Sequence, residues 1–136
     1  GMIERRRGGI LNIASTAAFQ PGPGMAVYYA TKAYVLSFTE ALAEELAGTG
    51  VTVTAVCPGP TKTNFGAAAN MRTLGLVKHF SMSAEVVARQ GHQAFRRGRV
   101  VAINGFRNQF PAFLVRLFPR AAVRKITKRL NNVNYS

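Results

Sequence analysis

The chain has 136 residues, the length of one domain, and 48% of them are hydrophobic, which supports a packed core and excludes general disorder. Its single cysteine, Cys57, excludes an internal disulfide framework and fits a reducing compartment, so we expect a cytoplasmic protein. The net charge of +13 is uneven: residues 1–95 carry 8 Lys and Arg against 5 Asp and Glu, whereas residues 96–136 carry 10 and no acidic residue.

The first half of the chain predicts a strand followed by a long helix. Residues 1–7 are typical of the polar end of a helix, which the glycines at 8 and 9 terminate. Residues 9–14 are mostly apolar, as in a buried strand of a parallel sheet. Residues 21–24 alternate Pro and Gly and predict a loop. Apolar residues at helical spacing then predict a helix over 25–47, which ends at the glycines of 48–50.

The second half repeats this alternation and ends in helices. Residues 51–57 predict a second strand, and 61–80 predict a loop with a short helix. Ser83 is a suitable N-cap for a helix that extends to about Arg96, and residues 99–104 predict a third strand. Two short helices are expected at 109–118 and 120–131, with Pro119 between them. This alternation predicts an α/β fold with a parallel sheet and right-handed crossovers.

One pair of side chains indicates a site for proton transfer. Tyr28 and Lys32 are four residues apart on the predicted helix and therefore share a face. An ammonium beside a phenol favours the phenolate and lowers the tyrosine pKa, so that the phenol can exchange a proton with a substrate oxygen near neutral pH. Ser15, at the end of the first strand, could reach the same oxygen. The alternative is an ordinary surface pair, with Ser15 as a strand-end cap.

Three motifs occur in a fixed order: Ser15, Tyr28-x-x-x-Lys32, and the segment Cys57-Pro58-Gly59-Pro60-Thr61-x-Thr63. Together they resemble the short-chain dehydrogenase/reductase family, and the resemblance covers roughly residues 1–104. It implies a partial Rossmann-type doubly wound parallel sheet, with three C-terminal strands and flanking helices, from the C-terminal half of a classical-type member.

The resemblance also implies a reaction, the NAD(P)-dependent interconversion of a small-molecule carbonyl and a secondary alcohol. Tyr28 would be the general acid and base, and Ser15 would hold the substrate carbonyl. Lys32 would lower the pKa of Tyr28 and bind the cofactor ribose beside it. The nicotinamide of NADP or NAD would be oriented by the residues after the second strand, namely Pro58, Gly59, Thr61 and Thr63.

The chain departs from the family pattern at its start. It has no glycine-rich turn to hold the cofactor pyrophosphate, and the strand at 9–14 would be left as a bare sheet edge. We therefore expect the chain to be marginally stable and inactive by itself. It would need a missing N-terminal half, as in a split reductase, or a homo-oligomer partner.

Residues 105–136 form a basic extension with an apolar side. Such a pattern can lie on an anionic membrane, cover a substrate pocket or pack on a second subunit. A non-enzymatic membrane-surface or partner-binding module therefore remains an alternative to an enzyme. We expect no nucleic acid partner, because no reading motif accompanies the charge, and no metal site, because no histidine has a partner at metal-ligand spacing.

Overall fold

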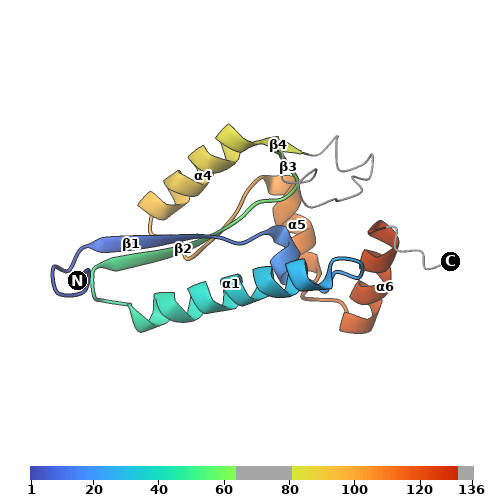
Figure 1. Cartoon of the computed structure of the whole chain (residues 1–136), viewed down its shortest axis with the longest axis horizontal. Coiled ribbons are helices and arrows are strands. Elements are labelled where there is room, and N and C mark those ends of the chain that lie inside the picture. The colour runs from blue at the N-terminus through green and yellow to red at the C-terminus, as the bar shows by residue number, and fades with distance from the viewer. Residues whose placement is uncertain (64–80, 132–136) are drawn as a thin grey trace.

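The computed structural model describes residues 1–63 and 81–131. A parallel three-stranded sheet, in the order β1 (Gly8–Ile13), β2 (Val51–Cys57) and β5 (Val101–Ile103), forms the middle layer. Helix α1 (Ala26–Glu45) covers one face of the sheet, and α4 (Ala84–Arg96) covers the other (Figure 1). The predicted α/β class and the three strands are confirmed.

The register between the strands leaves β1 at an edge. Gly8 pairs with Val51 and Ile13 with Val56, so the two strands run side by side over their whole length. Within the described residues β1 pairs with β2 alone, and the Ile13 side chain is 54% exposed. This confirms the predicted bare edge, where backbone N–H and C=O groups remain available for another strand.

Strand β2 lies at the centre of the core. All of its residues except Thr52 are buried, as expected for a parallel strand with helices on both faces. On the α1 side, Ala55 and Cys57 cluster with Leu36. On the α4 side, Val56 lies against Gly91, where a Cβ would be 3.0 Å from the valine Cγ2. The small residue lets the helix approach the sheet closely.

The remaining elements connect these layers and form the C-terminal extension. They are a 3-10 helix, two two-residue strands that pair with each other, and two helices: η1 (Thr16–Phe19), β3 (Thr61–Lys62), β4 (Met82–Ser83), α5 (Phe106–Leu114) and α6 (Arg120–Leu130). Ser83 accepts a hydrogen bond from the Val86 N–H at 3.3 Å, which confirms the predicted N-cap. The short helix predicted within 61–80 falls on 64–80, outside the described residues.

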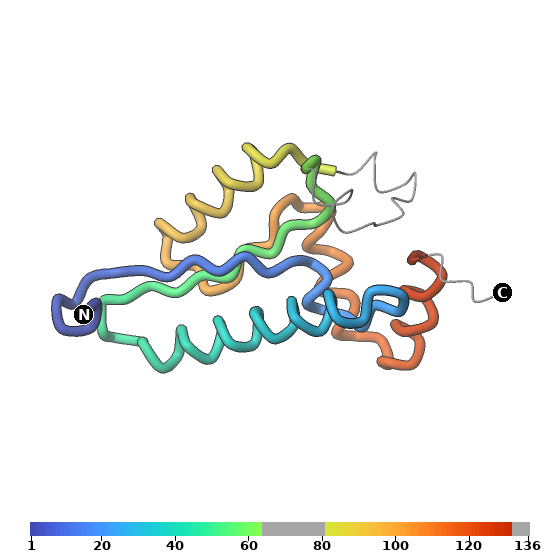
Figure 2. Tube along the Cα trace, viewed as in Figure 1, coloured from blue at the N-terminus to red at the C-terminus, as the bar shows by residue number. Residues whose placement is uncertain are grey.

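The C-terminal helices match their prediction only partly. Helix α5 begins at Phe106 and ends at Leu114, so it starts and stops several residues before the predicted 109–118. It starts directly after Gly105, whose φ of 78° sets the sharp entry from β5. In the trace of Figure 2, α6 lies beyond the far end of the sheet, close to the start of α1. No helix among the described residues meets the length and apolarity needed to cross a membrane.

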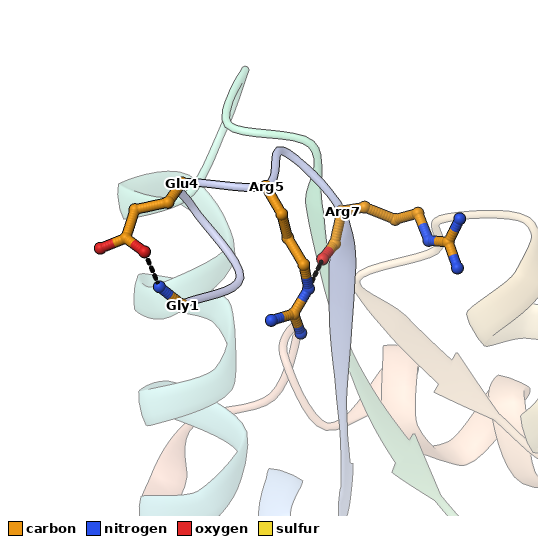
Figure 3. A network of polar contacts seen from close by, with 4 residues as sticks. All are labelled: Gly1, Glu4, Arg5 and Arg7. Atoms are coloured by element: carbon orange, nitrogen blue, oxygen red, sulfur yellow. Dashed lines mark hydrogen bonds and ion pairs between the residues drawn. The ribbon is translucent and has the colours of Figure 1, made fainter.

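The helix end predicted for residues 1–7 is wrong. This segment forms hydrogen-bonded turns instead, and Arg6 adopts a φ of 50°, a left-handed conformation that terminates a helical run. Figure 3 shows the polar contacts that fix the turns: the Gly1 amino group pairs with Glu4, and Arg5 Nε donates to the Arg7 carbonyl at 2.9 Å.

The contact between α4 and β2 can be tested at Gly91. We expect Gly91→Val to lower the free energy of unfolding by about 1–3 kcal/mol, because the added carbons overpack against Val56. Ala88→Val, at an exposed position of the same helix, is the matched control and costs below about 1 kcal/mol. Urea unfolding followed by circular dichroism measures both, and equal effects would contradict the close contact.

Candidate active site

The motif residues meet where β1 and β2 end. Ser15 follows β1, the Pro58-Gly59 turn follows β2, and α1 brings Tyr28 and Lys32 to the same end of the sheet. The backbone joins the two strand ends, because the Thr16 N–H donates to the Pro58 carbonyl at 2.9 Å. Carboxyl ends of parallel strands are the usual position of ligand sites in open α/β sheets.

Lys32 links the helix to the end of β1. Its Nζ donates to the Ile13 carbonyl at 2.9 Å and lies 5.9 Å from the centre of the Tyr28 ring. Both side chains are half-buried. The ammonium is therefore held two residues from Ser15 and next to the phenol, which is the grouping that the motif predicts.

Ser15 has a structural role as well as a position at the site. Its Oγ accepts a hydrogen bond from the Ala17 N–H at 3.1 Å and thereby caps η1. The hydroxyl also donates to the Pro58 carbonyl at 3.4 Å, the long limit for such a bond. The capping bond fixes the oxygen, while the weak second bond leaves its proton available to a better acceptor.

The turn after β2 is shaped by the C-terminal extension. A Cβ on Gly59 would collide with the Asn108 side chain, whose Nδ2 donates to the Asn104 carbonyl at 2.7 Å. Thr61 Oγ1 donates to the Gly59 carbonyl at 2.9 Å, and Thr63 follows as an exposed residue. Helix α5 therefore supports the segment expected to contact the nicotinamide.

The extension also contacts the loop before α1. Asn131 Nδ2, directly after α6, donates to the Pro23 carbonyl at 2.8 Å, and the Arg116 guanidinium lies 5.9 Å from the centre of the Phe19 ring. The described part of the extension therefore packs against the segment that leads into α1.

Cys57 lies at the end of β2, beneath the site. The pKa of its thiol is raised from 9.0 to about 11, and burial is the largest cause. Smaller contributions come from a backbone hydrogen bond at Ser15 and the Lys32 charge, which lower the pKa, and from the Glu40 charge, which raises it. The thiol is fully buried and free, which suits a packing residue better than a nucleophile.

A separate open groove of about 700 Å³ lies along β5, between the end of α4 and α5. It has Arg97, Arg99 and Phe113 in its lining, and it includes none of Ser15, Tyr28 and Lys32. Among residues 1–63 and 81–131, no group of three His, Cys, Asp or Glu side chains could hold a metal ion.

Comparison with known proteins identifies the family. The sequence profile described as short chain dehydrogenase matches residues 1–73, more than half of the chain. The chain belongs to the short-chain dehydrogenase family. It is 50% identical over 58 residues to a 3-oxoacyl-(acyl-carrier-protein) reductase of Synechocystis, an alignment that covers 43% of this chain and 24% of that protein.

Solved structures of the family share the fold. A short-chain dehydrogenase of Sphingobium yanoikuyae in complex with NADPH is 30% identical with a TM-score of 0.70, over 82% of this chain and 44% of that one. One from Burkholderia cenocepacia in complex with NADP is 26% identical with a TM-score of 0.69, over 89% and 48%. The chain spans about a quarter of the length of the curated relatives it matches and less than half of these structures.

Several contacts of the site were not foreseen from the sequence. The motif predicted Lys32 beside Tyr28 but not on the Ile13 carbonyl, and nothing near Asn131 indicates a partner 108 residues earlier. The Asn108 contact had a weak signal, since Asn104-Gly105 directly after a strand is typical of a tight turn that returns the chain to that strand end.

The support of the Gly59 turn by Asn108 can be tested by a double-mutant cycle. We expect Gly59→Ala to cost about 1–3 kcal/mol of stability, because its methyl group meets the Asn108 amide. Asn108→Ala removes that amide, so the double variant should be within about 0.5 kcal/mol of Asn108→Ala alone. Additive losses in urea unfolding would show that the two side chains do not compete for this space.

The buried Cys57 thiol makes the free energy of unfolding depend on pH at alkaline values. The folded chain holds the thiol proton up to about pH 11, whereas the unfolded chain releases it near pH 9.0. The contribution is therefore present below pH 9 and is lost as the pH rises toward 11. We expect the stability difference between the native chain and Cys57→Ala to shrink by about 1 kcal/mol or more between roughly pH 8 and pH 10. A difference independent of pH in urea unfolding would contradict the burial of the thiol.

Proposed function

We propose that this chain carries the proton-transfer half of an NAD(P)-dependent oxidoreductase that interconverts a carbonyl and a secondary alcohol. The observation that carries the proposal is the position of Lys32. Its Nζ donates a hydrogen bond to the Ile13 carbonyl at the end of β1 and lies 5.9 Å from the centre of the Tyr28 ring. This links the three predicted catalytic residues, Ser15, Tyr28 and Lys32, at one end of the sheet.

Each of these side chains has a distinct task in the proposed reaction. In reduction, the Tyr28 hydroxyl donates its proton to the carbonyl oxygen, and in oxidation the phenolate accepts the proton of the alcohol. Ser15 Oγ donates a hydrogen bond to the same oxygen and holds it in place. Lys32 keeps a positive charge beside the phenol, which stabilises the phenolate form.

The described residues fit one end of a nicotinamide cofactor. Lys32 has donors for the ribose hydroxyls beyond its bond to Ile13, and the Pro58-Gly59 turn provides backbone close to the catalytic residues, with Thr61 and Thr63 following. When bound, the nicotinamide supplies hydride exchange with the carbonyl carbon. Both similar structures named above are NADP or NADPH complexes, which supports this cofactor class for the chain.

The pyrophosphate end of the cofactor requires a binding segment that the described residues do not provide. Backbone N–H groups at a glycine-rich helix start hold this group in dinucleotide-binding folds, and no such segment follows β1. We propose that residues 1–104 are the C-terminal half of the domain, completed along the open β1 edge by an N-terminal half or by an oligomer partner. The pairing of β1 with β2 alone among the described residues supports this.

The rival function, a non-enzymatic module, has weaker support. The family match includes the segment with Ser15, Tyr28 and Lys32, which a binding module would not need. We propose a cytoplasmic location, which a chain with a single cysteine fits, with residues 105–136 as the part that would contact a membrane.

A chimera tests the function directly. The whole chain, with its supporting C-terminal helices, replaces the corresponding C-terminal part of the Synechocystis reductase, and consumption of NADPH is followed with a panel of ketones. We expect Tyr28→Phe to reduce kcat by about 100-fold or more, because the proton donor is lost while the ring remains. Lys32→Ala should also weaken the saturable binding of NADPH.

The matched control is Tyr29→Phe. The Tyr29 ring packs over Gly22, and the phenylalanine keeps that packing, so activity should remain. A chimera that binds NADPH and keeps its full rate with Tyr28→Phe would overturn the proposal. The chain alone is titrated in parallel with NADPH and NADH, and saturable binding lost in Lys32→Ala would refute the need for a second half.

A further inference from the structure

Helices α5 and α6 expose apolar side chains that no described residue covers. Phe106, Phe110 and Phe113 recur at helical spacing on α5, and they are 83%, 63% and 60% exposed. Leu117 continues this spacing beyond the helix and is also exposed. Exposed apolar side chains that lie together mark contact sites rather than ordinary surface.

Helix α6 also exposes apolar side chains, and it carries cations beside them. Val123 and Thr127 are buried and face the rest of the chain, while the apolar Ile126 and Leu130 are about half exposed. The polar side of the helix carries its cations, which are Arg120, Arg124, Lys125, Lys128 and Arg129. A basic polar side beside an exposed apolar flank is typical of helices that lie in a membrane interface.

The charge of residues 105–131 favours one kind of binding partner over others. Residues 105–131 contain seven Lys and Arg and no Asp or Glu. Two copies of such a surface repel each other, whereas an anionic surface attracts it. An anionic bilayer also accepts the phenylalanine side chains, which a purely ionic partner would leave in water.

We propose that the exposed apolar and basic side chains of residues 105–131, here called the tail surface, dock on an anionic lipid bilayer. The aromatic side chains of α5 enter the interface, and the cations of α6 contact the lipid phosphates. Because α6 is joined to the Pro23 carbonyl through Asn131, docking brings the loop before Tyr28 close to the membrane. A substrate dissolved in the bilayer would then meet the candidate active site near its source.

Co-sedimentation with vesicles tests the proposal on the whole chain. We expect binding to phosphatidylcholine vesicles that contain about 30% phosphatidylglycerol, and little binding to phosphatidylcholine alone. Raising NaCl from about 0.05 M to about 0.5 M should weaken it. Arg120→Glu/Arg124→Glu should weaken it by at least about twentyfold, because each cation near the surface contributes about fivefold. Phe106→Ser/Phe110→Ser should weaken it about tenfold or more.

Matched variants control for general changes in charge and exposure. Arg89→Glu/Arg96→Glu makes the same charge change at exposed positions of α4. Tyr34→Ser/Phe38→Ser removes an exposed aromatic pair with the same spacing on α1, whose rings stack at 6.0 Å. Both should bind vesicles like the native chain, and circular dichroism checks the fold of every variant.

Three results would overturn the proposal. The first is no binding to anionic vesicles at low salt, and the second is an equal loss in the control variants. The third is binding that needs the arginines but not the phenylalanines, which would indicate a soluble polyanion such as RNA or an acidic protein. Tyr28→Phe should leave vesicle binding unchanged, so failure of the catalytic proposal and failure of membrane docking are distinguishable.

Discussion

The whole structure depends on the burial of β2 on both faces and its pairing on both edges. Strand β2 carries small and β-branched side chains, which pack closely against α1 on one face and α4 on the other. Gly91 and Val56 set one distance, and Leu36 packs against the other face. Strands β1 and β5 pair in parallel with the two sides of β2, so the carboxyl ends of all three strands lie at the same end of the sheet.

The candidate site is a consequence of that arrangement. Ser15 and the Pro58-Gly59 turn are neighbours because β1 and β2 end together, and Lys32 reaches the same place because α1 crosses back over the sheet. The extension adds a second constraint, since Asn108 fills the space above Gly59 and Asn131 holds the loop before Tyr28. A region that looks like an appendage in the sequence is therefore part of the support of the site.

The two edges of the sheet differ in the groups that they expose for binding. Within the described residues β1 pairs with β2 alone, so its outer edge keeps backbone N–H and C=O groups available for another strand. The other edge is followed by α5 and α6, whose apolar and basic side chains face outward. The protein thus combines an edge suited to a protein partner with a surface suited to an anionic one.

The sequence by itself predicted the α/β class and its three strands, because hydrophobic periodicity is a local property. The three catalytic candidates, Ser15, Tyr28 and Lys32, rest on the order and spacing of the motifs. The sequence prediction failed at residues 1–7, where a left-handed Arg6 replaces the predicted helix end, and at the bounds of α5. Only the tertiary structure decided the bond from Lys32 to the Ile13 carbonyl and the contacts of Asn108 and Asn131. These join residues far apart in the chain, and their geometry arises only once the helices have packed against β2.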